Sequence, residues 1–297
     1  MHFDYTTVGH VTIDVLDDGS RRAGGTAFYS ALQAARLGQR TLILTQGVPS
    51  EIDALLAPHR DELELTVLPA PATTTLRTAG SGAERSQKLL AWAGAIAQEL
   101  ELDTSILHLA PVARESPSRW RGQAAFVGLT PQGLARQWDE RSGQIAHAEP
   151  DAEAAAVAER CHALVVNEAE RASCGELIVG ARAAGAIVAV TDGDAPVTIL
   201  APGVHSRPHG PDEHARGHID VHELPVPMLP EPVEDLGAGD VFAAAFFIAL
   251  SEALSPLEAA RFASAAAAVR IAGAGADAIG GRAAIEARLH ATARASG

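Results

Sequence analysis

Short apolar runs alternate with longer stretches of helical periodicity along most of the chain. Runs with strand character lie at residues 6–9, 41–45, 63–67, 106–109, 125–129, 163–166 and 187–191. Apolar positions recur at the spacing of one helix face at residues 26–37, 151–161, 168–184, 241–250, 256–271 and 281–293. Alternating strands and helices favour a parallel sheet with helices on both faces, so we predict a doubly wound, mostly parallel α/β fold.

Two segments do not follow that alternation. Residues 10–16 alternate between apolar and polar and end in the turn Asp17-Asp18-Gly19-Ser20, and residues 73–90 have the pattern of an antiparallel hairpin. Their polar faces do not belong in a parallel sheet that is buried on both sides. We therefore predict one domain over residues 1–297 with a small β lid, whose strands lie around 11–23 and 73–90. An open lid edge would also allow two subunits to pair as a homodimer.

The last third of the chain contains the clearest candidate for chemistry, Gly237-Ala238-Gly239-Asp240, which runs directly into an apolar helix. Glycines leave backbone N–H groups uncovered, and a helix N-terminus carries partial positive charge, so this turn could hold an anion. Asp240 in the first turn would be a base beside that anion, which indicates phosphoryl transfer. In a chain with 27 Gly, the same four residues could also be an ordinary helix start.

Polar residues also follow two predicted strands, where an open parallel sheet binds its ligands. Asn167 and Glu170 come after the strand at 163–166, and they either form a capping box or organise a hydrated Mg²⁺ beside a nucleotide phosphate. Thr191 and Gly193 come after the next strand, in a turn that either passes beneath phosphates or is only a tight strand exit.

The N-terminal segment offers a candidate for binding a second ligand. Asp14 lies on the predicted lid, and Gly24 and Gly25 open a helix. A carboxylate can accept two hydrogen bonds from a polyol, and a glycine pair lets backbone amides approach the same molecule. A lone carboxylate on an exposed strand is otherwise simply solvated.

Composition narrows the choice of partners and compartment. A net charge of −14 and a pI near 5.2 disfavour nucleic acids and anionic membranes, because phosphates are repelled on average. Cys161 and Cys174 have no metal or redox spacing, which fits a reducing cytosol. The N-terminus lacks a leader pattern, and no run reaches the roughly 18 apolar residues of a spanning helix, so we expect a cytoplasmic protein.

Histidines gather in one segment and raise the question of a metal site: His205, His209, His214, His218 and His222. Proline and glycine interrupt this segment, and no cysteine accompanies it, so we favour a solvated loop or hairpin. The chain also lacks the nucleophile elbow, the P-loop and the dinucleotide fingerprint after the first strand, which disfavours a hydrolase, a P-loop enzyme and a Rossmann oxidoreductase.

In their order along the chain, these motifs resemble the ribokinase-like (PfkB) family of carbohydrate and nucleoside kinases. The resemblance covers most of the chain. It comprises the first strand through Asp14, the first glycine signature at Gly24-Gly25, the Asn-x-x-Glu element at residues 167–170, the Thr-x-Gly turn at 191–193 and the second signature at 237–240.

The resemblance implies ATP-dependent phosphorylation of a hydroxyl on a small sugar, polyol or nucleoside. Asp240 would be the catalytic base, and the amides of Gly237, Ala238 and Gly239 would hold the γ-phosphate. The donor site would comprise Glu170 near Mg²⁺, with Asn167, Thr191, Gly193 and Ser264 near the nucleotide. The acceptor site would comprise Asp14, Gly24, Gly25 and Tyr29.

Several positions depart from the family pattern. Glu234-Asp235-Leu236 stands where family members commonly have Asp-Thr-Thr, which leaves a monovalent cation site open. Tyr29 replaces a sugar-contacting asparagine, Pro196 a second glycine, and Ser264 an asparagine near the adenine. The hairpin with Arg85 is similar to the lid of inositol-kinase-like members, which suggests an inositol as acceptor. These departures leave a second hypothesis, a non-catalytic ligand sensor on the same fold.

Overall fold

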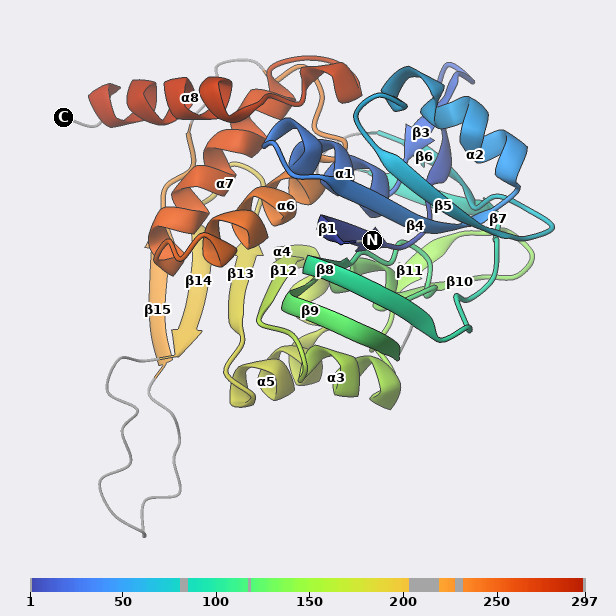
Figure 1. Cartoon of the computed structure of the whole chain (residues 1–297), viewed down its shortest axis with the longest axis horizontal. Helices are drawn as coiled ribbons and strands as arrows, with labels where there is room; N and C mark the ends of the chain where they lie inside the picture. The colour runs from blue at the N-terminus through green and yellow to red at the C-terminus, as the bar shows by residue number, and fades with distance from the viewer. Residues whose placement is uncertain (1, 81–84, 117–118, 203–218, 228–231, 296–297) are drawn as a thin grey trace, which may run out of the picture.

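The structure is a computed structural model that describes residues 2–80, 85–116, 119–202, 219–227 and 232–295 (Figure 1). Within these residues, nine strands form one sheet in the order β15-β14-β13-β12-β9-β8-β1-β4-β5. In chain order they are β1 (Phe3–Val8), β4 (Thr41–Gly47), β5 (Glu64–Pro69), β8 (Leu100–Leu109), β9 (Trp120–Leu129), β12 (Ala163–Asn167), β13 (Ile187–Thr191), β14 (Val197–Pro202) and β15 (Ile219–Leu224).

The pairing confirms the predicted fold class. Strands β5, β4, β1, β8, β9, β12 and β13 pair in parallel, and β14 and β15 add an antiparallel edge. The sequence analysis did not predict β14 and β15. For the polar, histidine-rich segment that lies between them and runs into β15, the expectation was a solvated loop or hairpin.

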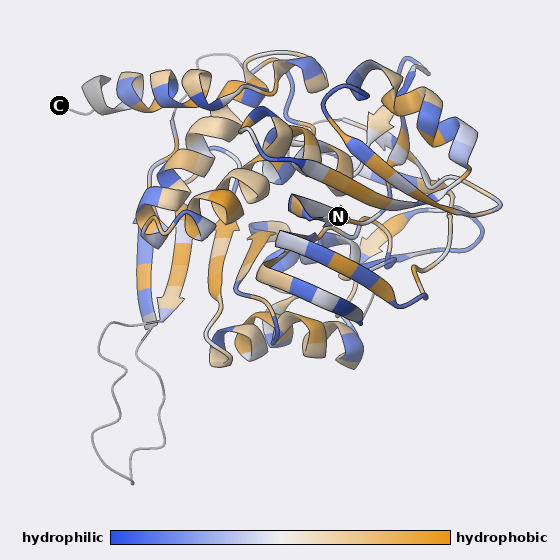
Figure 2. Ribbon diagram, viewed as in Figure 1, coloured by the Kyte–Doolittle hydropathy of each residue, from blue (hydrophilic) through white to orange (hydrophobic). Residues whose placement is uncertain are grey.

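Helices cover both faces of this sheet (Figure 1). One face carries α1 (Thr26–Arg36), α6 (Ala238–Ser251), α7 (Pro256–Ile271) and α8 (Arg282–Ala295), and the other carries α3 (Ala152–Ala158) and α5 (Gly175–Ala183). Figure 2 shows apolar residues along the inner strands and along α6, and these residues form a separate apolar core on each side of the sheet. The shorter helical segments are α2 (Pro49–Leu56), α4 (Glu168–Arg171), η1 (Ala57–His59), η3 (Pro131–Gly133) and η4 (Ala276–Ala278).

A second sheet of four strands forms where the lid was expected, in the order β3-β2-β6-β7. Its strands are β2 (Thr12–Val15), β3 (Arg21–Gly24), β6 (Thr75–Ala79) and β7 (Ser86–Ala91), and β6 and β7 form the predicted antiparallel hairpin. The small pair β10 (Arg136–Trp138) and β11 (Ile145–His147) lies beside it. Leu76 and Leu89 of this sheet pack against Val112 and Ala113, which holds the lid against the segment that follows the carboxyl end of β8.

The helices differ in one place from the sequence expectation and agree with it in another. The single helix expected at 168–184 is divided into α4 and α5, with a turn at residues 172–174 between them. In the part of the chain that the structure describes, none of the helices combines the length and the apolarity needed to cross a membrane.

Candidate active site

The N-terminus of α6 forms the centre of the site. Gly237 precedes the helix with a φ of 83°, in the left-handed region, and a side chain there would place its Cβ 2.5 Å from Cδ1 of Tyr29, so glycine is required for two reasons. The first helical bond runs from the Val241 N–H to the Gly237 carbonyl, and the Ala238 N–H donates to Asp235 O at 3.1 Å. The N–H groups of Gly239 and Asp240 therefore have no acceptor inside the helix, and Gly239 is exposed. This end of the helix is open to an anion.

Asp240 lies half-buried beside those amides. Its carboxylate accepts a hydrogen bond from Thr26 at the start of α1, and Nε2 of Gln132 lies 3.5 Å from its Oδ1. Gln132 also donates to the hydroxyl of Thr26. Withdrawal from water raises the pKa of Asp240 to about 6, while the Thr26 bond and the charge of Arg136 oppose that rise. The carboxylate is thus oriented by two neighbours and titrates close to neutral pH.

Arg136 of β10 is the positive group at the centre of the site. It donates to the carbonyl of Val112 at 2.9 Å and to the side-chain oxygens of Gln87 and Gln132 at 2.8 and 3.3 Å. Burial lowers the pKa of Arg136, and four carboxylates counteract this effect: those of Glu170, Asp240, Glu115 and Asp14. Arg136 therefore connects the Asp240 side of the site to the Asp14 side. Arg136 was not among the candidates from the sequence, because a three-residue strand gives no periodic signal.

Asn167 and Glu170 form the capping box that was one of two sequence hypotheses. The Glu170 N–H donates to Asn167 Oδ1 at 2.8 Å, and the Asn167 N–H donates to Glu170 Oε2 at 3.2 Å. Glu170 is only 5% exposed, and burial raises its pKa, with Arg136 lowering it and Asp240 raising it further. A buried carboxylate whose pKa is raised by a second carboxylate nearby fits a site for a divalent cation. The capping role and a metal role are therefore compatible for Glu170.

The other donor-site candidates lie at the carboxyl edge of β13 or on α7. Thr191 pairs with Asn167 in the ladder between β13 and β12, so both stand at the carboxyl edge. Gly193 follows in a turn with a φ of 54°, closed by the Ala195 N–H on the Asp192 carbonyl at 2.8 Å. Ser264 lies in α7, is 5% exposed, and has no hydrogen-bond partner for its hydroxyl among the described residues.

The acceptor-site candidates are brought together on the other side of Arg136. Asp14 is 3% exposed and accepts from Thr12 Oγ1 at 2.7 Å, and its carboxylate lies so close to Gly24 that a Cβ there would overlap it. Burial raises the pKa of Asp14, and the Thr12 hydrogen bond and nearby arginines lower it. Gly25 begins α1 with a φ of 90°. Asp14 is thus a buried carboxylate held against a glycine turn, unlike the solvated strand residue of the alternative hypothesis.

Tyr29, the last acceptor-site candidate, is a buried residue of α1. Its ring packs under Gly237, it is 2% exposed, and its hydroxyl has no partner among the described residues. Burial raises the pKa of Tyr29 to about 12. The tyrosine therefore lies directly against the backbone of the turn at the start of α6.

Two ion pairs join the lid to the segment before α6. Arg22 of β3 makes two hydrogen bonds to Glu234, and Arg85 before β7 pairs with Asp235. These partners explain why Glu234-Asp235 suits this chain at a position where the family pattern differs. The pairing could not be read from the sequence, because the partners are separated by 212 and 150 residues.

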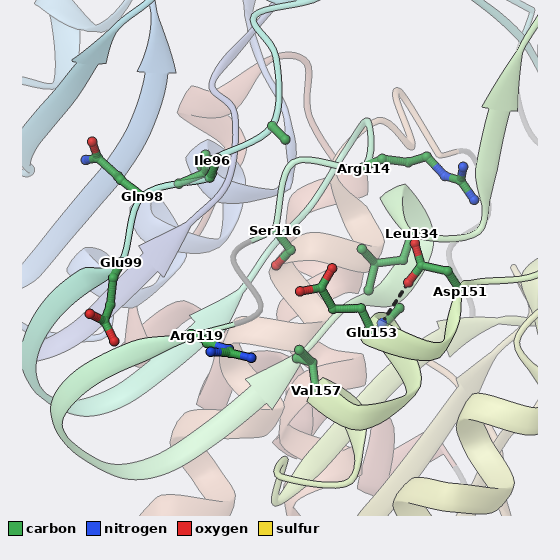
Figure 3. Close-up of a pocket in the computed structure, with 13 residues that line it drawn as sticks. Ile96, Gln98, Glu99, Arg114, Ser116, Arg119, Leu134, Asp151, Glu153 and Val157 are labelled. Atoms are coloured by element: carbon green, nitrogen blue, oxygen red, sulfur yellow. Dashed lines mark hydrogen bonds between the residues drawn. The ribbon is translucent and has the colours of Figure 1, made fainter.

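A cavity of about 360 Å³ lies outside this constellation (Figure 3). Its walls come from residues 95–99, the loop after β8 and helix α3, with Arg114, Arg119, Glu99 and Glu153 among the lining side chains. Charges of both signs lie around it, and it contains none of the candidate residues. We therefore place the candidate active site at α6 and not at this cavity.

The cysteines and histidines that the sequence singled out form no metal or redox site among the described residues. Cys161 and Cys174 are free, buried thiols, and burial raises both pKa values to about 12. Among the described residues, no cluster of three or more His, Cys, Asp or Glu side chains could hold a metal ion. His222 lies on β15 opposite Ile199, whereas His205, His209, His214 and His218 lie outside the described residues.

Comparison with known proteins gives a family match and a set of similar folds. The model of the pfkB family carbohydrate kinases matches residues 129–279, which include residues 237–240, Glu170, Thr191 and Ser264. The comparison with curated proteins gives no match.

Solved structures resemble the whole chain at low identity. A pyrophosphate-dependent kinase in the ribokinase family, complexed with a pyrophosphate analog and myo-inositol, is 20% identical with a TM-score of 0.70, over 95% of this chain and 99% of that one. The Arabidopsis thaliana ribokinase complexed with ribose and ATP is 17% identical with a TM-score of 0.66, over 97% and 99%. A Methanocaldococcus jannaschii nucleoside kinase is 15% identical with a TM-score of 0.66, over 97% and 98%. At these identities the likeness is one of fold.

Proposed function

Because the chain belongs to the pfkB family of carbohydrate kinases, we propose that it transfers the terminal phosphoryl group of ATP to a hydroxyl of a small sugar, polyol or nucleoside. The observation that carries this proposal is the position of Asp240, a carboxylate with a pKa of about 6 beside the open amides of a helix N-terminus. A base and an anion site in contact are what phosphoryl transfer requires.

Asp240 would take the proton of the attacking hydroxyl. A general base works best when its pKa lies near the working pH, and a pKa of about 6 leaves Asp240 mostly ionised at neutral pH. Thr26 and Gln132 would keep its carboxylate oriented.

The transferred phosphoryl group would lie against the amides of the α6 turn. The Ala238 N–H is engaged with Asp235 O, so the N–H groups of Gly239 and Asp240 offer the clearer contacts, with Gly237 providing the turn. The helix dipole and Arg136 would stabilise the negative charge that develops during transfer.

The donor would lie along the carboxyl edge of β12 and β13, near Asn167, Thr191, Gly193 and Ser264. Glu170 would hold Mg²⁺, in part through water, and the ion would supply charge neutralisation for the phosphates. The support for this position is the buried Glu170 carboxylate within electrostatic reach of Asp240.

The acceptor would lie between the lid and the central sheet, with Asp14 as hydrogen-bond acceptor for its hydroxyls and the Gly24-Gly25 turn and Tyr29 as neighbours. The named ligands of the similar structures, myo-inositol and ribose, are both small polyhydroxylated molecules. The hydroxyl groups of such a molecule would donate hydrogen bonds to the buried carboxylate and so replace the water that it has lost.

An acceptor screen tests the proposed function. The protein is incubated with Mg-ATP and separate inositols, pentoses, hexoses and nucleosides, and acceptor-dependent ADP release is measured. Pyrophosphate is included as a second donor, because one similar structure is described as pyrophosphate-dependent. Acceptor-dependent ADP supports the proposal, phosphate transfer from pyrophosphate alone corrects the donor, and tight acceptor binding without transfer from either donor supports the sensor.

A further inference from the structure

Arg270 is the largest fully buried side chain of the described residues, and the proposed mechanism does not use it. It lies near the end of α7 and is 0% exposed. Burying an arginine is unfavourable unless its charge is paired or hydrogen-bonded. The contacts of Arg270 therefore indicate the role of the buried charge.

The Arg270 guanidinium lies directly behind the anion-binding turn. Its Nη2 donates to the carbonyl of Leu236 at 2.6 Å, and its Nη1 donates to the carbonyl of Gly273 at 3.0 Å. Nη2 also lies 3.6 Å from Oε1 of Glu234, and the guanidinium carbon is 5.7 Å from the centre of the Tyr29 ring, which packs under Gly237. One positive group therefore contacts the approach to α6, the loop after α7 and the tyrosine below the turn.

The contact with Leu236 acts on the next residue through the peptide bond. The carbonyl of Leu236 and the N–H of Gly237 belong to one planar peptide unit and point in opposite directions, so a fixed carbonyl fixes that N–H. A charge-assisted hydrogen bond to the carbonyl also polarises the peptide and makes its N–H a stronger donor. Arg270 thus holds the first peptide of the anion-binding turn from the rear.

Glu234 completes the arrangement on the lid side. It accepts from Arg22 and from the Gly275 N–H at 2.8 Å. Burial alone would raise the pKa of Glu234, but these hydrogen bonds and the charges of Arg22 and Arg270 lower it, so it remains ionised. Two arginines around one carboxylate leave a net positive charge behind the turn, which favours an anion in front of it.

We propose that Arg270 is a positioning residue for the phosphoryl group, a built-in cation that fixes and polarises the anion-binding turn of residues 237–240. The inference rests on the proposed function of that turn. Carbonyl oxygens gathered around one charge are also what K⁺ would bind, and here the guanidinium occupies that position. The turn therefore needs no added monovalent cation, and the reaction rate should be equal in K⁺, Na⁺ and choline salts.

Arg36 offers a matched control. It also binds backbone carbonyls of the loop after α7, those of Ala276, Asp277 and Ile279, at 3.0, 3.2 and 2.8 Å. Its remaining hydrogen bonds go to Glu62 and not to residues 234–240. The variants Arg270→Met, Arg270→Lys and Arg36→Met therefore separate a general loss of loop packing from a specific effect on the turn.

The experiment measures affinity and turnover separately. Calorimetric titration with inorganic tripolyphosphate reports on the anion site whichever donor is used, and steady-state kinetics with the best donor and acceptor gives kcat and both KM values. By analogy with loss of an oxyanion donor, we expect Arg270→Met to lower kcat by about 10²-fold. We also expect its tripolyphosphate Kd and donor KM to rise about tenfold, its acceptor KM to change little, and Arg270→Lys to recover part of each loss. Arg36→Met should keep all four values within about twofold, whatever its Tm.

The outcomes distinguish the inference from the function on which it rests. A folded Arg270→Met protein with the kcat and Kd of Arg36→Met overturns the inference, as does a wild-type rate that depends on K⁺. If Arg270→Met does not fold, the comparison of K⁺, Na⁺ and choline salts on the wild type decides, because it needs no variant. If the wild type transfers no phosphoryl group but Arg270→Lys binds tripolyphosphate more weakly than Arg36→Met, the proposed function fails and the role of Arg270 in the turn stands.

Discussion

At the scale of single residues, the site consists of carboxylates that the fold has withdrawn from water. Asp14, Glu170 and Asp240 all have raised pKa values, and burial is the largest cause in each case. Arg136 lies among them and opposes each rise. Perturbed carboxylates grouped around one cation are typical of catalytic sites, whereas an isolated surface carboxylate titrates normally.

Replacing Asp240 tests its role as the base. We expect Asp240→Asn to lower kcat by about 10²–10⁴-fold with little change in donor affinity, because the amide keeps the shape and loses the proton acceptor. Steady-state kinetics and donor titration measure the two effects, with the exposed Asp61→Asn as control. Turnover equal to that of the control would remove Asp240 from the mechanism.

The pH dependence of turnover follows from the same carboxylate. With a pKa of about 6, protonation of Asp240 should reduce kcat below that pH with a slope of one and leave a plateau above about pH 7. A kcat profile in overlapping buffers from pH 4.5 to pH 8 shows the limb. An activity limb near pH 4, the ordinary range of a carboxyl group, would show that burial does not govern this group.

Stability should change with pH in the same window. The folded pKa of about 6 lies above the ordinary 3.8, so between these values the folded protein binds a proton that the unfolded chain releases, and its stability falls as pH rises. Asp240→Asn removes this titration. The Tm of the variant minus that of the wild type should therefore increase from pH 4 to pH 6.5 and then level off, as measured by differential scanning fluorimetry.

At the scale of elements, the lid and α6 are connected through side chains instead of a shared strand. Arg22 and Arg85 extend from β3 and from the residue before β7 to Glu234 and Asp235, just before the anion-binding turn. The lid position is thereby coupled to the segment that leads into α6.

Removing one of these links should loosen the lid. A partly buried ion pair contributes about 1 kcal/mol, so Arg85→Ala should speed hydrogen exchange in β6 and β7 roughly fivefold and raise the acceptor KM more than it lowers kcat. Hydrogen exchange of β1 and β4 should stay unchanged. The control is Arg121→Ala, whose 2.7 Å pair with Glu99 involves a side chain that is 75% exposed. Equal exchange in both variants would mean that the pair with Asp235 does not hold the lid.

At the scale of the whole molecule, the site depends on how closely α6 packs on the sheet. A Cβ at Gly128 of β9 would overlap the ring of Phe247 in α6, so only glycine allows this approach. Residues 237–240 belong to the start of the same helix, so its packing on the sheet bears on their position.

Adding a methyl group at Gly128 should destabilise the protein. Gly128→Ala is expected to cost about 1–3 kcal/mol in the free energy of unfolding, because the helix must move or the ring must leave its rotamer. Gly175→Ala is the control, since nothing lies within 4 Å of its Cβ and its backbone suits alanine. Urea denaturation measures both, and equal stability of the two variants would show that the helix can shift freely.

The sequence by itself determined the strands of the parallel sheet, the lid hairpin, the main helices apart from the division between α4 and α5, and the order of the glycine motifs. These features are local: periodicity marks each buried face, and the positive φ of Gly237 favours glycine through its own backbone. It also marked Glu170, which follows a strand end, and Asp240, which follows a glycine turn, whereas Asp14 was marked by its place on the lid and by the family resemblance.

Only the tertiary structure decided which charges meet. Arg136, Gln132, Arg22 and Arg270 carry no local signal, and their partners come from strands, loops and helices far away in the chain. The pKa of Asp240 is also a property of the tertiary structure, since burial and neighbouring charges set it. Electrostatic contacts depend on distance in space and not on spacing in sequence, so the chemistry of the site was decided by the fold that assembled it.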